Sequence, residues 1–142
     1  IINDREDNHF EIGKGELLRE GSDVNIVATG ICVSSALEAA EKLAADGVSA
    51  EVINIHTIKP LDTELIVKSA KKTGKVVTAE EHTIIGGLGG AVCEALSEKA
   101  PTPVLRIGIN DVFGESGTAA ELVAKYGLDG AGIYAKVKEF MK

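Results

Sequence analysis

The sequence predicts an α/β domain in which helices cover both faces of a mostly parallel sheet. Short apolar runs alternate along the chain with amphipathic segments of about a dozen residues, as they do where crossover helices join parallel strands. Hydrophobic residues make up 44% of the 142 residues, but aromatic residues only 4%, and there is no tryptophan. A core of Val, Ile, Leu and Ala therefore suits a layered domain, and the length is sufficient for one such core.

The N-terminal part divides into a polar segment and a weak strand. Residues 1–14 begin with Ile1 rather than methionine and show no apolar period, so we expect a linker from an upstream domain. We expect residues 15–142 to form a single domain. Glu16–Glu20 is charged at both ends and lies between glycines, which indicates a strand at the edge of the sheet.

Three strands and two helices are predicted next. Val24–Gly30, Ala50–His56 and Lys75–Ala79 are apolar runs that read as strands. A helix over Val33–Asp46 is expected to end before Gly47, and a helix over Thr63–Thr73 to lie between the N-cap residue Asp62 and Gly74. The side chains expected on the inner face of the first helix are Val33, Leu37, Ala40 and Ala44.

A polar loop and a glycine cluster follow the strand at Lys75–Ala79. Glu80–His82 supplies two acids and a histidine, and four glycines within residues 86–90 open a helix that runs to about Lys99. The inner face of this helix is expected to comprise Leu88, Ala91, Val92, Ala95 and Leu96.

The C-terminal part is predicted to hold the last strand and two helices. The strand is expected over Val104–Ile107, and a capping box at Thr118 and Glu121 indicates a helix that ends at Gly127. The final helix begins near Asp129, and its inner face is expected to comprise Ile133, Val137, Phe140 and Met141.

The composition argues against several classes of function. The net charge is −7 and no basic stripe is present, so we expect no nucleic-acid partner. No apolar run is long enough for a membrane span and no signal peptide opens the chain, so we expect a cytoplasmic protein without a membrane partner. Cys32 and Cys93 lack metal-ligand spacing, so we expect two free buried thiols and no metal site.

The glycine cluster is a weak candidate for phosphate binding. Glycine-rich helix starts bind anions through free N–H groups and the helix dipole. The dinucleotide fingerprint fails, because a third glycine counted from Gly87 would fall at Val92, and the Walker pattern is also absent. Two carboxylates stand where a phosphate would have to bind. We therefore expect the glycines to let the helix pack close to a neighbouring backbone.

The acids and the histidine after the strand allow two interpretations. Glu80, Glu81 and His82 could transfer protons. One of the two carboxylates could instead offset the positive end of the following helix, which is the interpretation that we favour. His56 is expected to be a structural hydrogen-bonding group, and Ser34 and Ser35 to be first-turn residues of a helix. We expect no catalytic residue in this chain.

Several motifs closely resemble the C-terminal domain of transketolase. The resemblance covers nearly the whole chain, and part of it is shared with deoxyxylulose-phosphate synthase and with β subunits of 2-oxoacid dehydrogenase E1 components. The segment most similar to transketolase is Phe113–Leu122. The segments that carry the resemblance are Phe10–Gly15, Leu18–Val24, Thr57–Asp62, Glu80–Gly90, Phe113–Leu122 and Lys125–Leu128.

The resemblance implies a three-layer α/β/α domain with a five-stranded mixed sheet of order 1-3-2-4-5 and strand 1 antiparallel. The switch point then lies between the strand ending at Gly30 and the strand ending near Glu81, where a ligand crevice or a domain interface is expected. The candidate residues are Thr29, Gly30, Glu81, His82, Gly86 and Gly87.

The resemblance also implies a division of labour. In this family, thiamine diphosphate and its Mg²⁺ bind between an upstream pyrophosphate-binding and an upstream pyrimidine-binding domain, so we expect neither cofactor-binding nor catalytic residues here. The expected role is assembly with those domains and in a homodimer that transfers two-carbon ketol units in the pentose phosphate pathway. The alternatives are the same domain of an E1 β subunit or of deoxyxylulose-phosphate synthase, and a free-standing nucleotide- or anion-binding regulatory module.

Overall fold

A computed structural model describes residues 15–30, 32–55, 61–83, 87–109 and 129–142, and of residues 81–83 and 109 only the backbone. The predictions for the linker at residues 1–14, for His56 and for the helix that ends at Gly127 lie outside the described residues.

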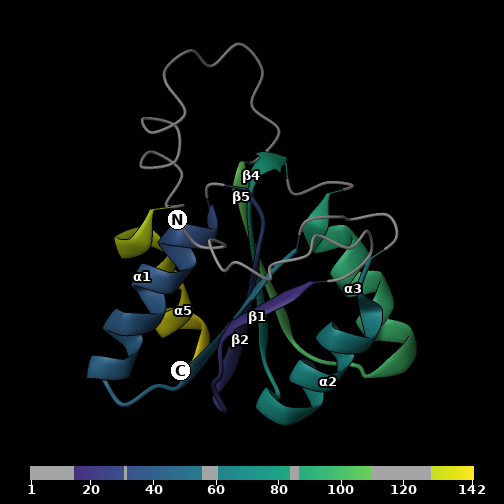
Figure 1. Ribbon diagram of the computed structural model, residues 1–142, viewed down its shortest axis with the longest axis horizontal. Helices are drawn as coiled ribbons and strands as arrows, with labels where there is room; N and C mark the ends of the chain where they lie inside the picture. Colours follow the sequence, from purple (N-terminus) through teal and green to yellow (C-terminus); the bar gives the residue numbers. More distant parts are fainter. Residues whose placement is uncertain (1–14, 31, 56–60, 84–86, 110–128) are drawn as a thin grey trace, which may run out of the picture.

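The described elements form one mixed sheet with helices on both of its faces (Figure 1). The strand order is β1-β3-β2-β4-β5; β1 pairs antiparallel with β3, and the other neighbours are parallel, which confirms the predicted topology. In chain order the elements are β1 (Glu16–Arg19), β2 (Val24–Ala28), α1 (Cys32–Ala45), β3 (Ala50–Asn54), α2 (Thr63–Thr73), β4 (Val76–Thr83), α3 (Leu88–Lys99), β5 (Val104–Ile109) and α5 (Gly130–Phe140).

Two apolar layers hold the helices to the sheet. Helices α1 and α5 pack on one face, and α2 and α3 on the other (Figure 1). Alternation along each strand supplies both layers, because successive side chains point to opposite faces. In β2, Ile26 belongs to the α1–α5 layer and Val27 to the α2–α3 layer. Both residues are fully buried, as expected for a central parallel strand.

The inner face of α1 differs from the prediction at its end. Val33 and Ala40 are buried and Leu37 is partly buried, but Ala44 is exposed and Leu43 is fully buried instead. A leucine side chain buries more apolar area than an alanine methyl group, so the helix presents Leu43 to the sheet. The prediction of Ala44 was wrong by one residue.

The caps predicted for α2 are confirmed, and the last helix begins next to Asp129 as expected. The Asp62 carboxylate accepts a hydrogen bond from Leu65 N at 3.3 Å, and α2 ends at Gly74 with φ of 78°. The Asp129 carboxylate accepts from Gly132 N at 2.8 Å at the start of α5. These bonds satisfy backbone N–H groups that a helix start leaves without partners.

Strand β4 is longer than predicted. It continues through Glu80, Glu81 and His82, for which the sequence predicts a loop, and ends at Thr83. Strand β5 extends with it to Ile109, and Thr83 pairs with Ile109 after a shift in register. Because β4 and β5 continue to pair beyond the last β2–β4 pair at Ala79, the polar residues remain in a strand.

The strands on the other side of the switch point are shorter than predicted. Strand β2 ends at Ala28, because Gly30 has φ of 58° and leaves the extended region. Strand β3 ends at Asn54. Neither Cys32 nor Cys93 forms a disulfide; Cys32 is buried as predicted, whereas Cys93 is half-buried rather than buried.

Candidate functional site

The carboxyl ends of β2 and β4 form the topological switch point of the sheet. Helix α1 leaves β2 toward β3, whereas α3 leaves β4 toward β5 on the opposite face (Figure 1). The Thr29 N–H donates to Ala79 O at 3.2 Å and joins the two strand ends. The switch point thus lies where the sequence placed it, and this is the position at which open α/β sheets bind ligands.

The structure describes part of the candidate set at this position. Thr29 is half-buried and Gly30 is exposed, and their carbonyl groups accept the N–H groups of Cys32 and Val33 in the first turn of α1. Gly87 is half-buried at the N-cap position of α3. These bonds give Thr29 and Gly30 a structural role at the start of α1.

The other candidates are placed only in part. The backbones of Glu81 and His82 lie in β4, but their side chains are outside the described residues, as is the whole of Gly86. Whether these side chains share one crevice with Thr29 therefore stays a prediction.

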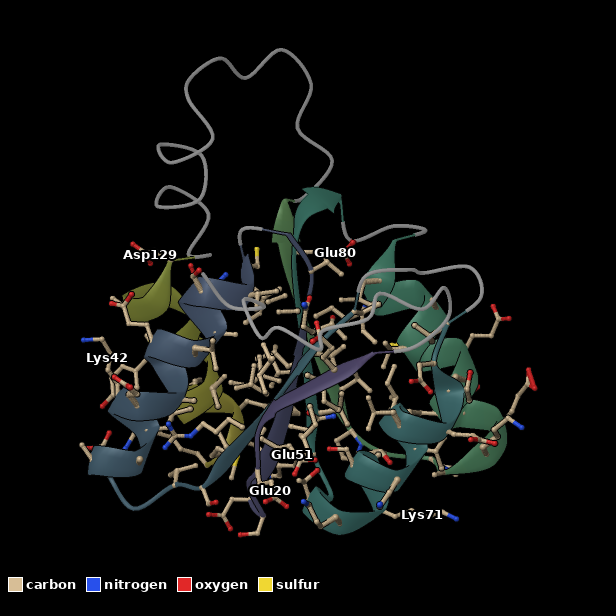
Figure 2. All side chains as sticks on the ribbon, viewed as in Figure 1. Glu20, Lys42, Glu51, Lys71, Glu80 and Asp129 are labelled. Atoms are coloured by element: carbon tan, nitrogen blue, oxygen red, sulfur yellow. The ribbon has the colours of Figure 1, made fainter. Side chains whose placement is uncertain are left out.

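Glu80 caps helix α3 from the neighbouring strand. Its side chain is 1% exposed, and its two carboxylate oxygens accept hydrogen bonds from Leu88 N at 2.9 Å and Gly89 N at 2.8 Å. Figure 2 shows Glu80 at the top of the sheet, beside the start of α3. A carboxylate here satisfies two N–H groups and complements the helix dipole. This confirms that one acid of the pair offsets the positive helix end.

At two glycines of the cluster, the space that a Cβ atom would fill is taken by side chains of neighbouring strands and not by a neighbouring backbone. A Cβ atom at Gly87 would lie 2.3 Å from Glu80 Oε1, which excludes a larger residue unless the carboxylate moves. A Cβ atom at Gly89 would lie 2.8 Å from Arg106 Nε and 3.1 Å from Thr78 Oγ1. The prediction of close packing was right, but the neighbours at these two glycines are side chains on β4 and β5.

This geometry limits the chemistry available at the start of α3. An anion bound here would compete with Glu80 for the N–H groups of Leu88 and Gly89, and it would meet a buried negative charge. In the described part of the chain, therefore, this helix start is occupied by the protein's own carboxylate and does not provide a ready phosphate site.

Sequence reasoning missed a second buried acid, Glu51 on β3. Its carboxylate accepts hydrogen bonds from Ser69 Oγ at 2.7 Å and Gly21 N at 3.1 Å, and it pairs with the Lys72 ammonium group. Burial alone would raise the pKa of Glu51, but the hydrogen bonds from Lys72, Ser69 and Gly21 together hold the pKa below its ordinary value. In the sequence this acid stands between apolar residues of β3, a pattern that normally indicates an exposed polar side chain in a strand. The pattern therefore gives no sign that Glu51 is buried.

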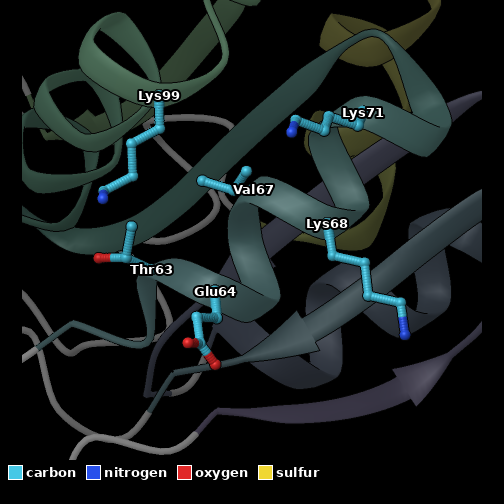
Figure 3. A pocket seen from close by; sticks show the side chains of 6 residues that line it. All are labelled: Thr63, Glu64, Val67, Lys68, Lys71 and Lys99. Atoms are coloured by element: carbon cyan, nitrogen blue, oxygen red, sulfur yellow. The ribbon is translucent and has the colours of Figure 1, made fainter.

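A basic cavity between α2 and α3 was also missed. It has a volume of about 420 Å³, and three lysines lie around it (Figure 3). Lysines three residues apart on α2 read as an ordinary solvated helix face, and the third lysine belongs to another helix. The cavity is lined by Thr63, Glu64, Val67, Lys68, Lys71 and Lys99.

The described residues provide neither a metal-binding cluster nor a membrane-spanning helix. Within these ranges, no group of three or more His, Cys, Asp or Glu side chains could hold a metal ion. Within the same ranges, no helix is long and apolar enough to cross a membrane.

Comparison with known proteins agrees with the fold. Residues 13–133 match the family model described as the C-terminal domain of transketolase. A solved structure described as a split-gene transketolase, an inactive β4 tetramer, superposes with a TM-score of 0.90 at 52% identity. That superposition covers 96% of this chain and 45% of the other chain.

Two curated relatives give the same result. A 6-deoxy-6-sulfo-D-fructose transketolase subunit from Clostridium sp. (strain MSTE9) is 54% identical over 88% of this chain and 39% of its own length. A 1-deoxy-D-xylulose-5-phosphate synthase from Geobacter sulfurreducens is 47% identical over 97% of this chain and 22% of its own length. The chain thus spans less than half the length of these relatives. On the strength of the fold, the family model and these relatives, the chain belongs to the family of transketolase C-terminal domains.

Proposed function

We propose that this domain is the assembly part of a thiamine-diphosphate-dependent transferase and that it performs no catalysis alone. The observation that carries this proposal is that the buried carboxylate of Glu80, next to the candidate residue Glu81 in β4, is committed to capping α3. The relatives support the proposal, because one is a transketolase subunit and another is a split-gene transketolase, each longer than this chain. The chemistry would then reside in the rest of the parent enzyme.

The described residues do not fit thiamine diphosphate at the start of α3. A diphosphate group there would face the Glu80 carboxylate and would have to displace it from Leu88 N and Gly89 N. This mismatch supports a cofactor site outside this domain, between the pyrimidine-binding and pyrophosphate-binding domains of the parent, with Mg²⁺ bound there as well.

The proposed parent reaction is the transfer of a two-carbon ketol unit from a ketose phosphate to an aldose phosphate. The proposed assembly is a homodimer in the cytoplasm, in which this domain packs on the upstream pyrimidine-binding domain. The second candidate for the parent is a 1-deoxy-D-xylulose-5-phosphate synthase, since a relative of that name is 47% identical over nearly the whole chain.

Reconstitution tests the proposal. The upstream part of the parent enzyme is expressed as a separate polypeptide and assayed for ketol transfer and for 1-deoxy-D-xylulose-5-phosphate synthesis, with and without this chain. We expect no turnover by the 142-residue chain alone and activity in one of the two assays when the parts are combined. Two results would refute the assembly role. One is full activity of the upstream part without this chain, and the other is Mg²⁺-dependent, saturable binding of thiamine diphosphate to this chain alone.

An ATP titration of the 142-residue chain tests the alternative that this domain is a regulatory module. A module that binds nucleotides at the glycine cluster would give saturable heat with ATP in a calorimetric titration, and the heat would fall in a Gly87→Ala variant. We expect no such heat, because Glu80 already holds the first N–H groups of α3.

A further inference from the structure

The cavity between α2 and α3 gathers positive charge on an acidic protein. Lys68 and Lys71 project from the outer side of α2, and Lys99 comes from the last turn of α3. One lining residue, Glu64, is acidic, so the lining carries three positive charges and one negative charge, in a chain whose net charge is −7. The local potential of this cavity is therefore opposite in sign to that of the chain as a whole.

The three ammonium groups are available to a ligand. Within the described residues, Lys68, Lys71 and Lys99 make neither an ion pair nor a hydrogen bond, whereas their neighbour Lys72 binds the buried Glu51 carboxylate. Because none of the three lysines forms an ion pair within the described residues, the lining keeps a net positive charge in spite of Glu64.

The volume of the cavity is sufficient for a small molecule. Its volume of about 420 Å³ lies within the range of roughly 300–1,000 Å³ that is usual for ligand pockets. Figure 3 shows Lys71 extending toward Val67, with Lys99 and Thr63 on the other side of Val67. Lys68 and Glu64 extend away from this group. The lining of the cavity thus includes the ammonium groups of Lys71 and Lys99 and the apolar side chain of Val67.

From these observations we propose that the α2–α3 cavity binds a phosphorylated small molecule, with Lys71 and Lys99 as the phosphate-binding residues. Ammonium groups bind phosphate oxygens through charge-assisted hydrogen bonds, and Val67 offers contact to the carbon skeleton. Lys99 is at the end of α3 opposite to the Glu80 cap, so this site is separate from the candidate crevice. The proposal does not depend on the assembly function.

The test is a titration of the 142-residue chain with inorganic pyrophosphate, in which the amide chemical shifts are monitored by NMR. Ionic strength is held constant and EDTA is present throughout. A second titration uses fructose 1,6-bisphosphate, and a third uses a polyglutamate peptide. We expect saturable shifts in α2 and α3 with both phosphate compounds. Chelation of divalent ions keeps this binding distinct from Mg²⁺-dependent binding of thiamine diphosphate.

Matched variants connect the shifts to the cavity. The Lys71→Ala and Lys99→Ala double variant should lose affinity about tenfold or more, because two charge-assisted hydrogen bonds disappear. Lys42→Ala is the control: it removes an exposed lysine that makes no ion pair within the described residues, from α1 on the opposite face of the sheet (Figure 2). Its affinity should stay within about twofold of the parent chain. Circular dichroism establishes that each variant is folded.

Four outcomes would overturn the proposal. They are no saturation with either phosphate compound, an unchanged affinity in the double variant, an equal loss in Lys42→Ala, and tighter binding of the polyglutamate peptide than of the phosphates. The last outcome would identify the surface as a docking site for an acidic protein segment instead.

Discussion

Replacement of Glu80 by alanine tests the central structural interpretation. The change removes both acceptors for Leu88 N and Gly89 N and leaves these N–H groups at the buried start of α3 without partners. Gln at the same position keeps one acceptor oxygen and places an amide donor where the second oxygen was. The Ala variant should therefore lose more stability than the Gln variant.

The magnitude follows from the two bonds. Hydrogen bonds to a charged group contribute about 1.5–3 kcal/mol each, whereas loss of an N-cap side chain costs about 0.5–2 kcal/mol in total. Glu80 makes two such bonds and is 1% exposed, so the loss should exceed that of an ordinary N-cap and stay below the sum of two full bonds. We therefore expect Glu80→Ala to lower the free energy of unfolding by about 2–4 kcal/mol. Relative to a total stability of about 5–15 kcal/mol, this loss is easily measured.

Urea unfolding followed by circular dichroism provides the measurement. Glu94→Ala is the matched control, because Glu94 is an exposed acid on the same helix, and its change should stay within about 0.5 kcal/mol. A Glu80→Ala variant as stable as the Glu94→Ala control would refute the capping argument.

Three further predictions use the same assay. Gly87→Ala should destabilise by about 1–3 kcal/mol, because its Cβ would lie 2.3 Å from Glu80 Oε1, whereas Gly90→Ala, with its nearest contact at 3.8 Å, should be neutral or stabilise α3 by up to about 1 kcal/mol. Equal effects of the two glycine changes would contradict the packing at Gly87. Because the pKa of Glu51 is lowered on folding, its contribution to stability is present above its ordinary value of 4.5 and is lost as the pH falls through the lower folded value. Glu51→Gln should therefore flatten the stability curve below pH 4.5, and an unchanged curve would argue against the role of this group. Asn25→Leu should lower the free energy of unfolding by less than about 1 kcal/mol or raise it, because the fully buried amide of Asn25 has no hydrogen-bond partner among the described residues. A decrease above about 2 kcal/mol would indicate a partner such as a buried water.

Two features of the candidate site could be predicted from the sequence. The switch point followed from the family resemblance, and the capping role of one acid followed from its position before a helix. The choice of Glu80 over Glu81 was not predictable, because it depends on which face of β4 points toward α3. Since β4 continues beyond Ala79, alternation places Glu80 on the same face as Thr78, under the glycines of α3.

The sequence by itself determined the features that depend on neighbours within a few residues. Helix ends are examples: an acid at the N-cap, such as Asp62 or Asp129, and the left-handed Gly74 contact backbone groups within one helical turn. The spacing of apolar residues is likewise visible along the chain. Only the tertiary structure decided which distant groups lie together. It buries Leu43 instead of Ala44, extends β4 along β5, and places Lys71 and Lys99 in the lining of one cavity. These contacts arise from close packing of side chains between layers, which no spacing along one element records.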